Sequence, residues 1–324
     1  MLKATITFLC LVLSIQLFAY YPIDPRPLRM LIKESEYIIR GKVLEVGKEK
    51  SSKKDYNSWE TDFAIIEIKE SIQGHLKDTK IKVHFAGGMI CPAPGVFYKN
   101  EDVLAFLDKT KKGDGYSVPA LSYGVKHGLT EEGFRLYTTR IREMQQILQT
   151  KEGKDQEEKI LDWLVTCSEN KATRWEGIYE LSPGNDFMSY YDNNDRRRKD
   201  IYLNKQQKQR LFSALLHVDT LDYYDLALVD ITKGIDDAIA LGILKKGLIT
   251  VDTTYLFTAE MIMKKIVDFT GDAELDEIHS KFSKLDYFDK NVQTERKTLL
   301  SLFIQKMQQV KCREGVNAPG GNYS

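Results

Sequence analysis

Tyrosines and arginines that could bind a flat anion gather between residues 182 and 199. Tyr190 and Tyr191 precede a run of three arginines, Arg196, Arg197 and Arg198. The guanidinium fork matches the two oxygens of a carboxylate or a phosphate, and a tyrosine ring can stack on a planar ligand. Long loops inside helical regions are often functional. These residues are therefore a candidate ligand site, with a solvated loop that binds nothing as the alternative.

A second combination of aromatic and cationic side chains lies between residues 48 and 59. Tyr56 and Trp59 follow four lysines and could stack on a base or a sugar. The same lysines are interspersed with Glu49 and Asp55, as on an ordinary solvated hairpin. Tyr56 and Trp59 are therefore candidate ligand-binding residues, but we predict no nucleic-acid partner.

The motifs of common enzymes and metal sites are absent from the sequence. It contains no Cys-x-x-Cys, no His-Glu-x-x-His, no Gly-x-Ser-x-Gly, no phosphate-binding loop and no dinucleotide fingerprint. Five histidines are present, and none pairs with another at the spacing of metal ligands: His75, His84, His127, His217 and His279. We expect structural or surface roles for them, with His84 on the polar face of a strand. The sequence therefore predicts no catalytic residue, no metal and no cofactor, and favours a protein that is not an enzyme.

The composition excludes two further classes of protein. Of the 324 residues, 42% are hydrophobic and 29% are charged, and 47 Lys and Arg face 47 Asp and Glu. A chain with this apolar content can bury a core, so it is not a disordered tail. A net charge of zero gives no bulk attraction to a polyanion. At roughly 100–200 residues per domain, the length predicts two domains.

Residues 1–19 have the pattern of a secretory signal peptide. Lys3 precedes an apolar run over residues 6–19, which is shorter than the roughly 20 residues that span a bilayer. We expect cleavage after about Ala19. The alternative is an uncleaved anchor, which Pro22 and Pro25 oppose because they end a helix. The pattern predicts a secreted or periplasmic protein with no transmembrane span after cleavage.

Removal of the signal peptide would leave three cysteines, Cys91, Cys167 and Cys312. An odd number in an exported protein allows at most one disulfide within the chain, and the sequence does not decide whether two of them pair. Cys167 continues a helical stripe that contains Ile160 and Trp163, so we expect it to be a small buried hydrophobe. Cys91 has no basic neighbour in sequence that would lower its pKa, and we expect it to be unreactive.

Residues 20–137 show the alternation of apolar and polar side chains that is typical of half-buried strands. A shift of phase near Gly41 indicates a bulge. The candidate strands cover residues 37–46, 64–69, 81–85 and 103–107, with shorter ones at 116–121 and 134–137. Five or six successive strands without helices predict an antiparallel sheet, and closure into a barrel removes its edges.

Three of these segments carry a resemblance to a known fold. SEYIIRGKV at 35–43, IQG at 72–74 and NEDVLAFL at 100–107 resemble the small OB-like barrels of bacterial exported proteins. In layout these barrels are similar to the netrin-like domains of tissue metalloproteinase inhibitors. Those inhibitors approach the metal of their target through an N-terminal Cys, whereas here no Cys lies between Tyr20 and Cys91. The resemblance therefore implies the OB-like barrel and does not carry the inhibition over.

From residue 138 to residue 313 the apolar period changes to about 3.6, which predicts helices. Three residues are expected to cap helices: Asp155, Asp219 and Asp272. Helices are expected to end at Gly153, at Gly177 or Pro183, at Gly234 and at Gly271. The helices resemble a short HEAT-like stack, with an irregular bundle as the alternative because no motif recurs at a constant period. The fold class is therefore α+β, an OB-like barrel followed by an all-α domain. We expect residues 314–324 to be a disordered tail.

Together these features predict a non-catalytic exported protein. It would bind or scaffold another exported protein or a protein of the bacterial envelope. One alternative is a protease inhibitor or modulator that acts through the barrel rim. A further alternative is an enzyme with a site between the domains, which requires a cleft lined by carboxylates. The sequence names neither the partner nor the oligomeric state.

Overall fold

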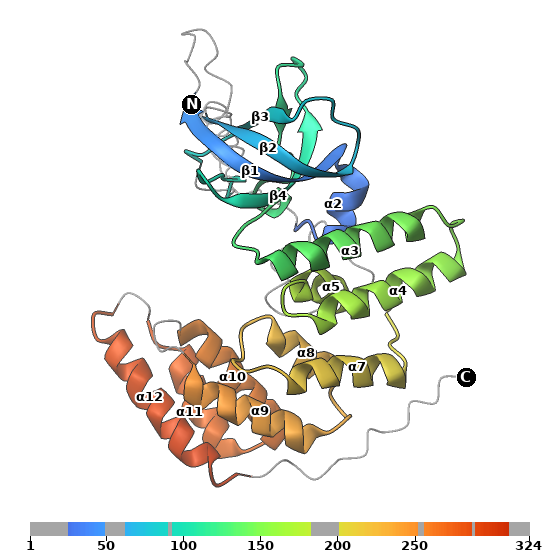
Figure 1. The fold of residues 1–324 in the computed structure, drawn as a ribbon. Coiled ribbons are helices and arrows are strands. Elements are labelled where there is room, and N and C mark those ends of the chain that lie inside the picture. Colours follow the sequence, from blue (N-terminus) through green and yellow to red (C-terminus); the bar gives the residue numbers. More distant parts are fainter. Residues whose placement is uncertain are drawn as a thin grey trace, which may run out of the picture. The chain divides into compact units, whose positions relative to one another are not determined.

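The computed structural model describes residues 25–48, 62–89, 93–182, 201–251, 256–286 and 289–310. The chain forms two compact units, the first made of Met1–Cys167 and Lys171–Lys199 and the second of Ser168–Asn170 and Asp200–Ser324. The first unit contains a β-barrel with helices, and the second contains helices (Figure 1). The expected signal peptide and C-terminal tail lie outside the described residues. The domain bounds expected from the sequence stay a prediction.

Five strands close a barrel in the first unit. They are β1 (Tyr37–Lys48), β2 (Asp62–Gln73), β3 (Lys80–Phe85), β4 (Asp102–Lys109) and β5 (Tyr116–Ser117); the short β6 (Val125–Lys126) pairs with β4. The order is β1-β2-β3-β5-β4, and β4 pairs again with β1 to complete the ring. All pairs are antiparallel except the parallel pair of β3 and β5. This arrangement confirms the OB-like barrel.

Apolar side chains that alternate along the strands fill the barrel. The buried core residues of β2 and β3 are at most 6% exposed: Ala64, Ile66, Ile81, Val83 and Phe85. In β4 every residue of the run 103–107 is buried, as its continuous apolar sequence predicts. Side chains therefore fill the interior of the barrel, which is a hydrophobic core and not a ligand cavity.

Gly41 lies where β1 bends to pair with two strands. Residues 37–42 of β1 pair with β4 while the strand also pairs with β2, and the register shifts between Arg40 and Gly41. A Cβ at Gly41 would lie 2.5 Å from Ile66 Cγ2 and 2.8 Å from the carbonyl oxygen of Glu67. Only glycine fits this close approach of two strands. The expected bulge near Gly41 is confirmed.

The described helices of the first unit are α2 (Leu28–Glu34), α3 (Glu131–Leu148), α4 (Lys154–Glu169) and α5 (Arg174–Leu181), together with the 3-10 turn η1 (Leu121–Gly124). Thr130 begins α3, because its Oγ1 accepts the backbone N–H of Gly133 at 3.1 Å. Glu131 and Glu132 occupy the first turn, where carboxylates stabilise the positive end of the helix. Residues 134–137, expected as a short strand, are therefore helical. The cap outweighs the local alternation of apolar and polar residues.

The helices of the second unit are α7 (Lys205–Leu216), α8 (Asp225–Ile231), α9 (Asp237–Thr250), α10 (Leu256–Thr270), α11 (Ala273–Ser283) and α12 (Val292–Met307). Asp272 caps α11 as expected. Gly234 and Gly271 follow helix ends with φ values of 85° and 62°, the left-handed backbone that favours glycine. Asp219 caps no helix, because α8 begins at Asp225. Two further predictions in the first unit are wrong: Asp155 lies inside the first turn of α4, and Gly177 lies inside α5.

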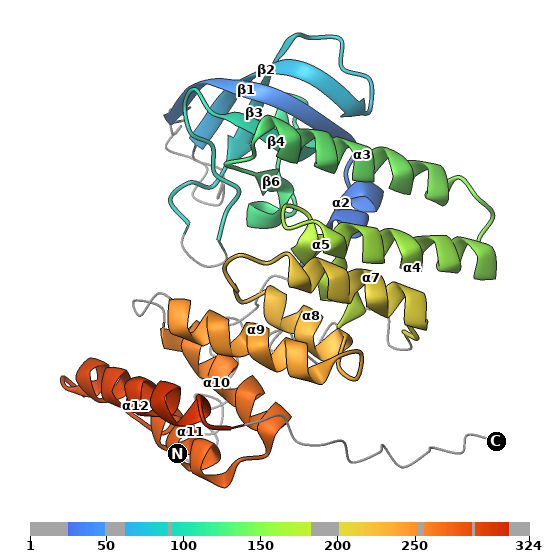
Figure 2. The same ribbon diagram turned by 60° about the horizontal axis from the view of Figure 1, so that its bottom comes forward.

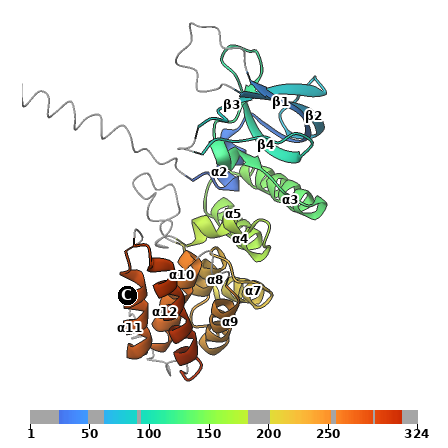
Figure 3. The ribbon, with the colours of Figure 1, turned by 90° about the vertical axis from the view of Figure 1, so that its left-hand side faces the viewer.

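Neighbouring helices of the second unit pack in sequence order. α9 packs on α10, and α11 packs on both α10 and α12 (Figures 2 and 3). A barrel followed by helices confirms the α+β class. Among the described helices, none combines the length and the apolar content that crossing a membrane requires.

Candidate functional site

The site residues predicted from the sequence all lie outside the described residues. They are Tyr56, Trp59, Tyr190, Tyr191, Arg196, Arg197 and Arg198. The two ligand loops therefore stay predictions. Among the described residues, the candidate site lies within the second unit.

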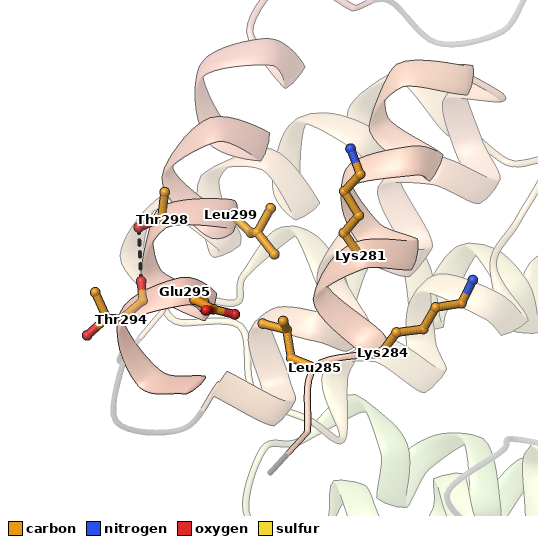
Figure 4. Close-up of a pocket in the computed structure, with 7 residues that line it drawn as sticks. All are labelled: Lys281, Lys284, Leu285, Thr294, Glu295, Thr298 and Leu299. Carbon is orange, nitrogen blue, oxygen red and sulfur yellow. Dashed lines mark hydrogen bonds between the residues drawn. The ribbon is translucent and has the colours of Figure 1, made fainter. Parts of the chain in front are cut away.

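An open groove of about 550 Å³ lies between α11 and α12. Its lining comes from the C-terminal end of α11, the residues that follow it and the first two turns of α12: Lys281, Lys284, Leu285, Thr294, Glu295, Thr298 and Leu299. Figure 4 shows the two lysines on the α11 side and Thr294, Glu295 and Thr298 on the α12 side, with the two leucines between them. Most of the lining surface is apolar.

The groove exists because two amphipathic helices meet along their apolar stripes. α11 buries Leu275, Ile278 and Phe282, and α12 buries Leu300 and Phe303 among others. Leu285 and Leu299 lie beside these stripes rather than on them, and both are only half-buried. They therefore form an apolar floor that the helix pair leaves open to solvent.

Arg296 connects α12 to α11. The residue is 2% exposed, and its guanidinium carbon lies 5.3 Å from the centre of the Phe282 ring. A guanidinium over an aromatic face is a favourable contact, especially away from water. Arg296 follows Glu295 of the lining in sequence, so this contact helps to hold together the two helices that form the groove.

Of the charged residues at the rim of the groove, one has an ion-pair partner among the described residues and two do not. Lys281 Nζ lies 2.7 Å from Glu277 Oε1, and this hydrogen bond lowers the pKa of Glu277. Lys284 and Glu295 form no ion pair within the described ranges, and both are exposed. Thr298 Oγ1 donates to the carbonyl oxygen of Thr294 at 2.9 Å. The groove therefore offers an apolar floor, one available ammonium group and one available carboxylate.

Two buried carboxylates of the first unit, Glu176 and Glu180, hold helices together. Glu176 Oε1 lies 2.7 Å from Lys126 Nζ and accepts a hydrogen bond from the Tyr137 hydroxyl at 2.9 Å. Glu176 Oε2 accepts the backbone N–H of Leu28 at 2.7 Å. Burial, and then the charge of Glu176, raise the pKa of Tyr137 well above its ordinary value. Because both of its oxygens accept hydrogen bonds from these groups, Glu176 has a structural role and is not a candidate base.

Glu180, one helical turn further along α5, is satisfied in the same way. Both of its oxygens accept from the guanidinium of Arg29, at distances of 2.5–2.9 Å, and its side chain is fully buried. A bidentate pair of this kind holds two elements in one orientation. Glu176 and Glu180 together fix α2 against α5.

Cys167 is buried, as the helical stripe predicts. It is a free thiol, and burial raises its pKa well above the ordinary value. Such a thiol is neither a nucleophile nor a metal ligand at neutral pH. Cys91 and Cys312 lie outside the described residues, so the disulfide question stays open.

His84 differs from its expected position. It is 7% exposed rather than solvated, and its Nε2 lies 4.0 Å from Asp114 Oδ1. The reason is the parallel pair, in which His84 lies opposite Ser117 of β5. The neighbouring strand and the turn before it cover a side chain that alternation alone assigns to solvent.

Two further grooves, both in the first unit, are lined by charges that already have partners. In the groove of about 460 Å³ between the barrel and α3, Arg142 lies 2.6 Å from Glu70, and Arg40 and Arg135 each pair with a glutamate. The groove of about 530 Å³ between α3 and α4 contains the pair of Arg140 and Glu143 at 2.9 Å. A ligand would have to displace these pairs, which makes both grooves weaker candidates.

Among the described residues, no group of three or more His, Cys, Asp or Glu side chains is placed to hold a metal ion. The sequence offered one signal for the α11–α12 groove, the pair of lysines three residues apart before Leu285. That signal alone does not distinguish a groove from a solvated helix end. Comparisons of the chain with protein-family models and with curated proteins find no match.

Proposed function

We propose that this chain is a non-catalytic binding protein whose α11–α12 groove takes an apolar segment of another exported or envelope protein. The observation that carries the proposal is the open apolar floor of Leu285 and Leu299 beside Lys284, which is exposed and has no ion pair with a described residue. An exposed apolar surface bordered by polar residues is a common mark of a protein-binding site. The open form of the groove suits a peptide segment better than a small molecule, which is usually enclosed.

The chemistry of the groove favours binding over catalysis. Thr298, a hydroxyl in its lining, donates to a backbone carbonyl, and no His lines the groove to act as its base. Glu295 is exposed and has no hydrogen-bonded acid or base beside it among the lining residues. The buried carboxylates of the first unit have their oxygens occupied by structural donors.

The lining also specifies the occupant. Two leucines accept one or two large apolar side chains, and Lys284 attracts a carboxylate near them. Glu295, on the opposite side, favours a positive group there. We therefore expect a segment with an apolar anchor, an acidic residue toward α11 and a basic residue toward α12.

Site-specific photo-crosslinking in the native host tests this function. A photoreactive residue at Thr298, inside the groove, should give one dominant crosslinked partner. The same residue at Lys297, which is exposed on another side of α12, should give none. Leu285→Asp in the Thr298 probe should remove the crosslink. Tyr202→Asp, at an aromatic side chain that is 85% exposed and does not line the groove, should leave the crosslink unchanged. Equal crosslinking from both probes would contradict the proposal.

The exported location belongs to the same proposal, and its support is the signal-peptide pattern of residues 1–19. N-terminal sequencing of the protein from its host should find Tyr20 at or near the start. Recovery of the intact chain from the cytoplasm would exclude export.

A second candidate, modulation of a protease through the barrel rim, has one observation in its favour. Tyr98, in the loop before β4, is 60% exposed, and its ring lies 5.6 Å from that of His127. An exposed, supported aromatic ring is a common anchor at interfaces. Inhibition of an exported protease at micromolar protein, and its loss in Tyr98→Ala, would favour this candidate over the groove.

A further inference from the structure

The apolar floor of the α11–α12 groove continues along α12. Leu302 is 39% exposed and follows Leu299 by three residues, while Glu295 precedes Leu299 by four. Side chains three and four residues apart lie on the same side of a helix. Leu302 therefore extends the floor, and we call Leu285, Leu299 and Leu302 together the apolar strip. From Glu295 to Leu302 the helix rises about 10 Å.

Two antiparallel helices border the apolar strip. At one end, Leu285 after α11 and Glu295 near the start of α12 line the same groove (Figure 4). At the other end, Glu274 Oε1 in the first turn of α11 lies 2.7 Å from Lys306 Nζ in the last turn of α12. An occupant of the strip therefore lies alongside both helices.

The backbones of both helices are already hydrogen-bonded. N–H and C=O groups inside α11 and α12 pair within their own helix, and the Thr298 hydroxyl in the lining donates to the carbonyl oxygen of Thr294. An extended segment on the strip would bury its own N–H and C=O groups beside leucine side chains, without partners there. A helix pairs these groups internally, so it covers apolar surface without that cost.

The lining also disfavours two other common modes of peptide recognition. Addition of a strand requires an exposed sheet edge, and the walls of this groove are helices. Proline-rich segments bind in grooves lined by aromatic rings, and none of the lining residues is aromatic. An amphipathic helix requires an apolar groove with charges at its rim, which α11 and α12 provide.

We propose that the α11–α12 groove binds an amphipathic helix of its partner protein, which lies along the apolar strip. This inference rests on the proposed function of the groove and specifies the conformation of the occupant. Apolar residues of the partner at positions i, i+3 or i+4, and i+7 contact the three leucines. To cover the strip, the partner helix needs about three turns, or about 11 residues.

The rim charges specify which end of the partner helix is charged. Lys284 and Glu295 lie where α11 finishes and α12 begins, and neither has an ion pair with a described residue. At the other end of the strip, Glu274 and Lys306 pair with each other. The partner helix therefore carries an acidic residue beside Lys284 and a basic residue beside Glu295, and it needs no charge near its other end.

The positions of crosslinks measure the conformation of the occupant. Photoreactive residues are placed at Glu295 and at Leu302, in separate full-length chains in the native host, and the attachment sites in the partner are mapped by mass spectrometry. The separation of seven residues along α12 corresponds to about seven residues of a partner helix, but to about three residues of an extended chain. We expect attachment sites about seven residues apart in one segment.

The outcomes distinguish this inference from the proposed function. Attachment sites about three residues apart would leave the binding function standing and overturn the helix. A probe at Leu302 that captures no partner, while the probe at Thr298 captures one, would do the same. Absence of a crosslink from Thr298 would remove the proposed function and this inference with it.

Substitution of Leu302 tests whether the occupant reaches beyond the groove. In the chain with the Thr298 probe, Leu302→Asp should lower the crosslink yield about fivefold or more, because a carboxylate replaces an apolar contact. Leu302→Met keeps the position apolar and should retain most of the yield. Tyr202→Asp, at an exposed side chain outside the lining, is the control and should not change the yield. An unchanged yield in Leu302→Asp would overturn the proposal, because the occupant would then end at Leu299.

Discussion

The backbone N–H of Leu28 donates to Glu176 Oε2 at 2.7 Å, a hydrogen bond between residues 148 positions apart. Leu28 is the first residue of α2, and the residue before it, Pro27, has no side-chain acceptor. Glu176 therefore supplies from α5 the cap that the local sequence lacks. The same carboxylate also holds Lys126 and Tyr137, so one side chain connects α2, α5, β6 and α3.

We expect Glu176→Gln to lower the free energy of unfolding of the first unit by about 3 kcal/mol. The substitution leaves Lys126 without the opposite charge in a site where water cannot replace it. Urea unfolding followed by tryptophan fluorescence measures the change. Glu132→Gln, in an exposed pair with Arg135, is the matched control and should change stability little. Equal losses in the two variants would contradict a special role for burial.

Gly41→Ala should destabilise the barrel by about 1–3 kcal/mol. The added Cβ would lie 2.5 Å from Ile66 Cγ2 and 2.8 Å from a strand carbonyl, so two strands must move apart. Gly88→Ala, where a Cβ meets nothing within 4 Å, provides the comparison and should be close to neutral. Thermal unfolding of both variants decides the point, and a neutral Gly41→Ala would show that the strands can separate freely.

The stability of the second unit should fall as the pH drops below about 6.5. Burial lowers the pKa of His279 beneath its ordinary value of 6.5, against the opposing charge of Glu260. Between the two pKa values the unfolded chain binds a proton that the folded chain does not, so unfolding becomes easier as the pH falls. Above pH 6.5 both states are neutral and the contribution is constant.

The variant His279→Gln tests the origin of this pH dependence. It removes the titrating group and should flatten the stability profile just below pH 6.5. Urea midpoints at several pH values measure it. Besides Glu260, the charged groups that act on this histidine are Lys264, Asp268 and Asp276, which stay in place. An unchanged slope in the variant would assign the dependence to those carboxylates.

Cys167 should be inert in the folded protein. Burial raises its pKa well above the ordinary thiol value, so almost no thiolate is present at pH 8. In a chain of residues 20–324 with Cys91→Ser and Cys312→Ser, a thiol reagent should react only after denaturant is added. Fast labelling of the native protein would place Cys167 at an accessible surface instead.

The sequence predicted the elements that depend on local pattern. Alternation located the strand at 81–85 and the continuous apolar run located the buried strand at 103–107, because side-chain period follows directly from backbone geometry. Asp272, Gly234 and Gly271 mark helix ends for equally local reasons, a side-chain acceptor and a left-handed backbone.

The features that depend on packing could not be predicted in this way. Glutamates are usually exposed, yet Glu176 and Glu180 are buried because donors from distant segments meet them. Leu285 and Leu299 form a groove only because their helices meet at a particular angle. The helix α2 was missed because it is seven residues long and its cap lies in α5.

The ion pair between Arg29 and Glu180 can form only after most of the first unit has been synthesised. The two residues are 151 positions apart, so the segment that leaves the ribosome early has no partner until α5 has followed it. Until then α2 can pack on α3, but it lacks both the cap from Glu176 and the ion pair with Glu180. The first unit closes late in synthesis, and a chain that stops before residue 180 lacks the side chain that completes it.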